Sequence, residues 1–150
     1  MVVLAELRER HLRRTLTHRS CRRGIESIEA AIALPLVLIV IFSGFEYSWA
    51  LLRTVQLDHA ARLGARHAAL DGSTAAAVQT RVGNSLDALG ISGAQITIEP
   101  AQPELAAPGT AVSVRVEVPY SNVGLLGLDR LMPLPSSLRG HASMVREPED

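Results

Sequence analysis

One long apolar stretch dominates the pattern of hydrophobic and polar positions. Residues Ala30–Phe45 carry no charge, and Glu46 is the only charged residue before Arg53. At about 1.5 Å per helical residue, Ala30–Leu52 would span roughly 33 Å, enough to cross a hydrocarbon core of about 30 Å. The stretch therefore predicts a transmembrane helix over residues 25–52. A buried core helix is the alternative, but a run this long and this apolar is typical of a membrane span.

Helical periodicity continues beyond the span and then repeats. Residues 54–70 contain no proline, and small or apolar residues recur on one face: Leu57, Ala61, Gly64, Ala65 and Ala68. Asp71-Gly72-Ser73 interrupts this helix, and Asp71 or Ser73 is placed to cap the next one. A second helix is predicted over 74–89, with Ala75, Val78, Val82, Leu86 and Leu89 on one face. Gly90 is placed for its carboxyl-terminal cap.

The last part of the chain alternates with the period of a β-strand. Residues 95–99 alternate and stop at Pro100, and Val112–Val118 alternates over its whole length. Residues 138–146 alternate again and form a third predicted strand. Residues 122–135 form a longer connection, in which we expect four leucines to make a hydrophobic plug: Leu125, Leu126, Leu128 and Leu131.

These elements predict an α+β fold. A long amino-terminal transmembrane helix extends into an exported domain that holds a second helix and a three-stranded antiparallel sheet, because packing three strands on two amphipathic helices is the economical arrangement. The predicted parts are a basic leader (1–24), the span (25–52), the α+β domain (53–147) and a tail (148–150).

Charge along the chain predicts the orientation of the span. The formal net charge is zero, but the residues before the span are rich in arginine, with only Glu6 and Glu9 as acidic residues. By the positive-inside rule the amino terminus is cytoplasmic and the residues from about Arg53 onward lie across the membrane, periplasmic or extracellular. The adjacent span explains this basic cluster, so nucleic-acid binding is not expected. The single cysteine, Cys21, excludes an internal disulfide.

A glycine and a glutamate at a defined spacing precede the apolar run. Arg22-Arg23-Gly24-Ile25 leads into it, and Glu29 lies five residues after Gly24. This resembles a type IV prepilin leader, which implies cleavage by a prepilin peptidase between Gly24 and Ile25. It also implies that Glu29 faces the new amino terminus of a neighbouring subunit. Ala30 stands where the Tad/Flp branch usually has Tyr or Phe. Alternatively, Glu29 only marks the lipid boundary.

A longer ordered set of residues is similar to the TadE-like pseudopilins of the tight-adherence (Tad/Flp) pilus system. The set consists of Gly24, Glu29, Pro35, Glu46-Tyr47 and Ala60-Ala61-Arg62-Leu63-Gly64-Ala65-Arg66. The closing segment 142–147 also resembles the last strand of that family. The resemblance implies a minor pseudopilin of the inner membrane that takes part in Flp pilus assembly, and thereby in adherence and biofilm formation.

The same resemblance implies roles and partners. Glu29 and Glu46 become the assembly or recognition residues, with Glu46 expected near the far membrane interface beside Tyr47 and Trp49. The implied partners are the prepilin peptidase, other pseudopilins, the Flp pilin, the inner-membrane assembly platform and the lipid bilayer. The competing interpretation is a single-pass membrane protein whose exported domain binds or senses a ligand and is unrelated to pili.

No pattern of catalytic or metal-binding residues emerges. His59 and His67 lie on roughly one helical face, but no acidic or cysteine partner completes a metal set. Phosphate-loop, zinc-protease and serine-hydrolase motifs are absent from the sequence. Arg62 and Arg66 favour a solvated face with an Asp58–Arg62 pair, or alternatively a contact with lipid head groups or a partner subunit. We therefore expect a protein that is not an enzyme and needs no cofactor.

Overall fold

The computed structural model describes residues 2–127 and 132–147, with side chains from Glu26 onward. The predicted tail, 148–150, lies outside these residues. Helix α1 (Val2–Ala69) runs through two compact units, Met1–Phe42 and Ser43–Asp150. In its described residues the first unit is helix alone, and the helix continues through Pro35. A proline inside a helix is a feature that membrane helices tolerate.

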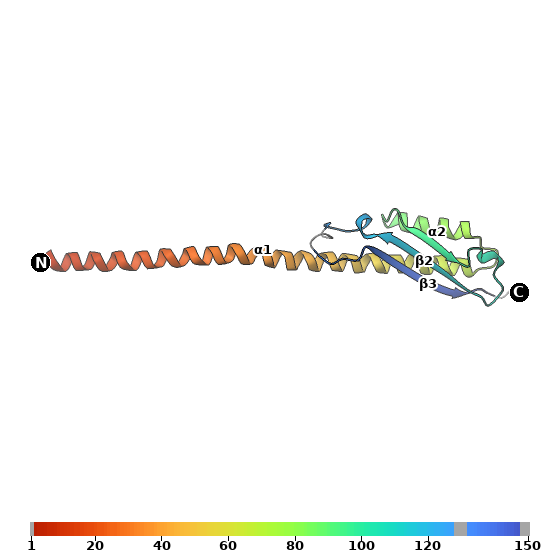
Figure 1. Cartoon of the computed structure of the whole chain (residues 1–150), viewed down its shortest axis with the longest axis horizontal. Helices are drawn as coiled ribbons and strands as arrows, with labels where there is room; N and C mark the ends of the chain where they lie inside the picture. The colour runs from red at the N-terminus through yellow and green to blue at the C-terminus, as the bar shows by residue number, and fades with distance from the viewer. Residues whose placement is uncertain (1, 128–131, 148–150) are drawn as a thin grey trace. The chain divides into compact units, whose positions relative to one another are not determined.

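The second unit, Ser43–Asp150, is an α+β domain (Figure 1). The rest of α1 is followed by α2 (Ala75–Ala88) and by three strands, β1 (Gln95–Glu99), β2 (Ala111–Pro119) and β3 (Ser137–Val145). Two short 3-10 turns, η1 (Pro103–Leu105) and η2 (Tyr120–Asn122), lie between strands. The sheet is antiparallel in the order β1-β2-β3, with Val116 paired to Ile96 and Gly140. The predicted fold class and all three strands are confirmed.

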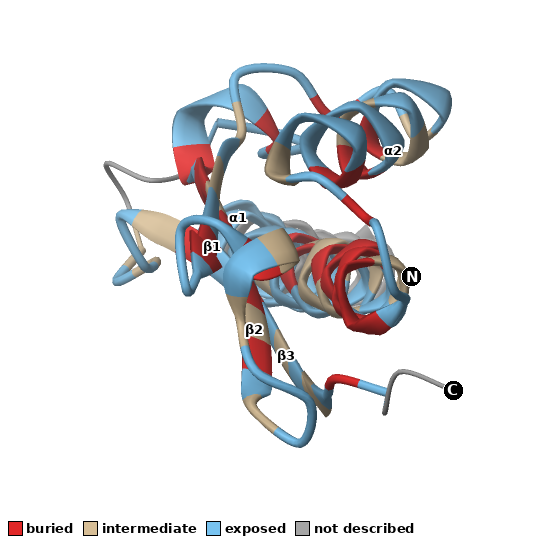
Figure 2. Cartoon of the chain, turned by 90° about the vertical axis from the view of Figure 1, so that its right-hand side faces the viewer, coloured by how far each residue is buried: buried red, intermediate tan, exposed pale blue. Residues whose placement is uncertain are grey.

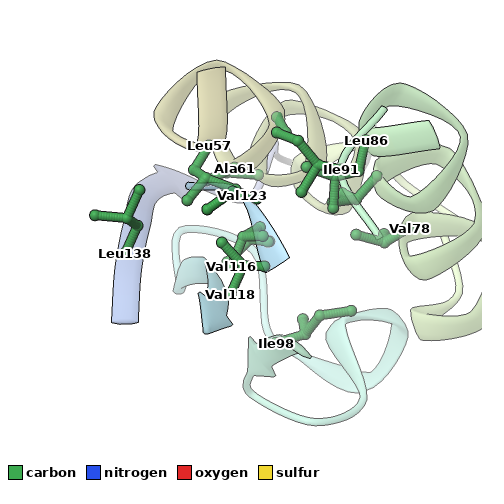
Figure 3. Packing of buried hydrophobic residues seen from close by; sticks show 14 of the residues in the cluster. Leu57, Ala61, Val78, Leu86, Ile91, Ile98, Val116, Val118, Val123 and Leu138 are labelled. Atoms are coloured by element: carbon green, nitrogen blue, oxygen red, sulfur yellow. The ribbon is translucent and has the colours of Figure 1, made fainter. Parts of the chain in front are cut away.

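The core lies between one face of this sheet and the two helices. Every second residue of β2 is fully buried, namely Val112, Val114, Val116 and Val118. The predicted face of α1 is buried, namely Leu57, Ala61, Gly64, Ala65 and Ala68. Of the predicted face of α2, Val78, Val82 and Leu86 are buried, and Ala75 and Leu89 are partly buried. Figure 3 shows side chains from both helices and from β2 pointing toward one another. The intervening β2 residues remain more exposed (Figure 2), because one face of the sheet has no covering layer.

The connection between the helices is capped differently from the prediction. Thr74, rather than Asp71 or Ser73, is the N-cap of α2, and its hydroxyl accepts a hydrogen bond from the Ala77 N–H at 3.3 Å. Asp71 and Ser73 have other partners: Asp71 accepts from the Gly72 N–H, and Ser73 Oγ lies 2.6 Å from His67 Nδ1. Gly90 has the expected positive φ at the end of α2, with Ile91 N–H bonded to Leu86 O.

Two glycines allow α1 to approach its neighbours closely. A Cβ atom on Gly64 would lie 2.5 Å from Val82 Cγ2 of α2, and 3.2 Å from Val114 Cγ1 of β2. A Cβ atom on Gly140 of β3 would meet the backbone of α1 itself, at Leu57 and Asp58. The absence of a side chain at these two positions therefore sets how near the helix lies to the sheet.

Candidate functional site

The surface of the first unit is largely apolar from Ala30 onward. The side chains from Ala30 to Phe42 are exposed, and they include Ile32, Leu36, Val40 and other large apolar groups. Among the described residues, one helix is long enough and apolar enough to cross a membrane. The most apolar part of that helix is not buried by other parts of the protein. An exposed run of this length fits a single-pass membrane anchor.

The amino-terminal motif lies at the start of this surface. Glu26 and Glu29 are both exposed, so the Glu29 carboxylate is open to another molecule. Gly24 and Ile25 belong to the helical backbone of α1, and their side-chain surroundings lie outside the described part. The expected cleavage between these two residues remains a prediction.

Glu46 is held inside the second unit. Its side chain is fully buried, and its carboxylate accepts three hydrogen bonds. Tyr120 Oη donates to Oε1 at 2.6 Å, Leu125 N–H donates to Oε1 at 3.2 Å, and Leu126 N–H donates to Oε2 at 2.9 Å. Direct contact of this carboxylate with another subunit would require the loop that holds it to move. The observed role of Glu46 is to anchor the segment after β2 on helix α1.

This anchoring explains why the expected hydrophobic plug is wrong for Leu125 and Leu126. Both leucines are about half exposed, at 48% and 46%. Their backbone N–H groups point at Glu46, and their side chains remain accessible at the surface. Val123 is buried in the core instead. Leu128 and Leu131, the other two residues of the expected plug, lie outside the described residues.

Two aromatic residues next to Glu46 fasten the same connection. Trp49 Nε1 donates to Val123 O at 2.7 Å, and Tyr47 Oη donates to Pro133 O at 3.1 Å. The guanidinium of Arg53 lies 4.6 Å from the Trp49 ring centroid and donates to Leu89 O at 2.9 Å. Glu46, Tyr47 and Trp49 therefore bind both described ends of the β2–β3 connection to a single stretch of α1.

A second polar anchor, which the sequence did not reveal, lies at the end of β3. Arg146 is 5% exposed, and its Nη1 donates to the carbonyls of Pro103, Glu104 and Ala106. Its Nη2 lies 2.9 Å from Asp71 Oδ1. Arginine has several donors in a fixed geometry and can satisfy such a set of acceptors, which joins η1, β3 and the turn after α1.

The remaining polar candidates are bonded within the second unit or exposed to solvent. Asp58 accepts the His141 N–H at 3.1 Å, so its observed partner is strand β3 rather than Arg62, and Arg62 and Arg66 are exposed. Hydrogen bonds from Ser137 and Arg139 lower the pKa of Glu117 on the open sheet face. Among the described residues, no group of three or more His, Cys, Asp or Glu is placed to hold a metal ion.

Comparison with known proteins found a match within α1. The family model of TadE-like proteins matches residues 24–66. The matched segment begins at Gly24 and ends at Arg66, and it contains Glu29 and Glu46. No curated protein and no solved structure matches the chain. The family match therefore confirms, over residues 24–66, the resemblance of this protein to the TadE-like proteins of the Tad pilus system.

Proposed function

We propose that this protein is a membrane-anchored minor pseudopilin that takes part in assembling Tad/Flp pili, and thereby in adherence. The observation that carries the proposal is the family match over residues 24–66, which unites the leader glycine, the exposed Glu29 and the apolar span. Its role is structural rather than enzymatic. Its partners are the prepilin peptidase, other pseudopilins, the Flp pilin and the assembly platform of the inner membrane.

The arginine excess before the span supports a cytoplasmic amino terminus, with the α+β unit on the exported side. This orientation places the Gly24–Ile25 bond on the cytoplasmic side. That is where a prepilin peptidase of this system would cut.

Processing is expected between Gly24 and Ile25. In cells that contain the active peptidase, the membrane form should begin at Ile25 and lack Cys21, which mass spectrometry of the purified protein detects. Gly24→Leu should retain the leader, because a large side chain at this position restricts the backbone approach that a protease needs. An intact leader on the unmodified chain in the presence of active peptidase would contradict the prediction, and would implicate Ala30 as the residue that prevents recognition.

Cleavage would create a new positive charge close to Glu29. The amine of Ile25 and the Glu29 carboxylate can both remain hydrated near the head groups while the subunit is isolated. When apolar helices pack into an assembly, Glu29 enters a drier environment, where an unpaired carboxylate costs about 2.5–3.5 kcal/mol at a helix centre. A salt bridge to the Ile25 amine of a neighbouring subunit would offset this cost and fix the axial stagger between the two helices.

Replacing Glu29 tests this function directly. Glu29→Gln keeps the shape of the side chain and removes its charge, so membrane insertion should be normal. Recovery of partner pseudopilins by co-purification should fall about tenfold or more, since a hydrogen bond to a charged group contributes about 1.5–3 kcal/mol. Pilus number, counted by electron microscopy, should fall with it.

Glu26→Gln is the matched control, because Glu26 is also exposed and lies on the same helix. It should leave both measurements unchanged. Normal partner recovery and normal pilus number in Glu29→Gln would indicate that Glu29 only marks the lipid boundary and has no role in assembly. Such a result would favour the alternative of an exported sensing or ligand-binding domain.

A further inference from the structure

An uncharged loop lies where α1 enters the second unit. We call residues Gly124–Gly127 the boundary loop; its two leucines are flanked by glycines, and no residue from Tyr120 to Leu128 is charged. Leu125 and Leu126 are about half exposed, and Phe45, next to Glu46, is 59% exposed. Figure 1 shows the connection between β2 and β3 at the end of the unit where α1 enters it. This end of the unit therefore presents apolar side chains from both the helix and the loop.

The position of the boundary loop along α1 coincides with the expected edge of the membrane. A hydrocarbon core of about 30 Å takes about 20 helical residues, so a span that begins at Ala30 extends to the region of Trp49. Glu46 lies inside that limit, and its hydrogen bonds to Leu125 N–H and Leu126 N–H hold the boundary loop at the same level. Three hydrogen bonds compensate the carboxylate, so the loop can bring it close to lipid without leaving a bare charge.

We propose that the boundary loop is a second membrane contact, in which Leu125 and Leu126 insert into the head-group boundary of the exported-side leaflet. The proposal goes beyond pilus assembly and rests only on the membrane anchoring that the proposed function includes. Lipid is the occupant that the observations favour, because Glu46, which binds the loop, and the exposed Phe45 both belong to a helix that is long and apolar enough to cross a membrane. The loop has neither a charged group nor an aromatic ring of the kind that dominates protein interfaces.

Site-specific fluorescence on the full-length chain in lipid nanodiscs tests this contact. A Cys21→Ser background allows one new cysteine at a time to carry an environment-sensitive dye, with Leu126→Cys as the test position. Val40→Cys reports on the span, because Val40 is exposed in the apolar helix. Leu105→Cys is the aqueous control, since Leu105 is 76% exposed in η1, a segment that Arg146 holds near Asp71. Lipids with a nitroxide at a shallow or a deep position serve as quenchers.

The expected result has a distinct signature at each position. The dye at Leu126 should emit at shorter wavelength than the dye at Leu105 and should be quenched more by shallow than by deep nitroxides. The dye at Val40 should be quenched more by deep nitroxides. Equal emission and equal quenching at Leu126 and Leu105, with normal deep quenching at Val40, would overturn the loop contact and leave the anchor intact.

Two other outcomes also overturn the proposal. Absence of quenching at Val40 would remove the membrane anchor, and with it both the loop contact and the proposed function. Shielding of Leu126 only after other pilus subunits are added would assign the boundary loop to a protein partner instead of lipid.

Discussion

Gly140→Ala should strongly destabilise the second unit. The new Cβ atom would lie 2.5 Å from both Asp58 N and Leu57 O and would contact the carbonyl carbon of Leu57. All three atoms belong to the α1 backbone, which cannot move aside by a change of rotamer as a side chain can. Overpacking that side chains can absorb costs about 1–3 kcal/mol, and a collision with backbone should reach at least the upper end of that range.

Relief of this collision would push β3 away from α1. Separation of the two elements would also break the hydrogen bond from His141 N–H to Asp58 Oδ1, which is 3.1 Å long and attaches the edge strand to the helix. For a unit of this size a loss of 3 kcal/mol lowers the melting temperature by roughly 12 °C or more. Circular dichroism of the full-length protein in detergent measures that shift.

Gly83→Ala is the control for the added methyl group. Gly83 lies within α2, and a Cβ atom there meets nothing within 4 Å. Alanine at a helix-interior position is favoured over glycine by about 0.5–1 kcal/mol, so this variant should melt at a slightly higher temperature. An unchanged melting temperature in Gly140→Ala would mean that the helix and the strand are not as close as described.

Glu46→Gln should loosen the connection between β2 and β3. The carboxylate of Glu46 accepts from three donors, whereas an amide has one acceptor oxygen and would point its own N–H groups at one of them. Hydrogen bonds to a charged group contribute about 1.5–3 kcal/mol each, and a buried donor left unpaired adds to the loss. We expect a total of about 2–4 kcal/mol, with faster proteolysis within the connection than in the unmodified protein.

Tyr120→Phe is the companion variant, because it removes one donor and leaves the two backbone N–H groups bonded to Glu46. It should cost about 1–2 kcal/mol, and the double variant should lose less than the sum of the single variants, since the two groups share one hydrogen bond. A different result would contradict this role: the Glu46→Gln protein could be as stable and protease-resistant as the unmodified protein and still fail to co-purify with pilus subunits. That result would indicate that Glu46 acts in subunit recognition.

The periodic pattern of apolar residues predicted the helices and strands, because the buried face of each element must be apolar at the period of that element. Val112, Val114, Val116 and Val118 must all face one side of a strand, and the small residues of α1 must recur at helical spacing to lie against them. The observed strands therefore begin and end within one residue of the predicted ones. The residues between these valines, Ser113, Arg115 and Glu117, are polar and lie on the uncovered face of the sheet.

The hydrogen bonds of Glu46 and Asp58 were not predicted, because no periodic pattern in the sequence marks them. The hydrogen bonds of Glu46 with Leu126, and of Asp58 with His141, join residues 80 and 83 positions apart. Hydrophobicity alone predicted that Leu125 and Leu126 would be buried in a plug. The buried carboxylate of Glu46 needs hydrogen-bond donors, and the loop provides its backbone N–H groups, which leaves both leucine side chains exposed. The close approach at Gly140 likewise depends on tertiary contact, and an isolated glycine in an alternating strand does not reveal what lies opposite it.

The long sequence separation of these anchors constrains the order in which the second unit can fold. Chain synthesis delivers α1 first, with Leu57 and Ala61 uncovered and Asp58 lacking the strand that it will bind. Their partners in β2 and β3 arrive many residues later, and the Asp71–Arg146 pair closes only when β3 has emerged completely. Contacts this distant in sequence form slowly, because a long loop must be closed before they contribute. The fold of this unit is therefore completed only after the whole of β3 has been synthesised.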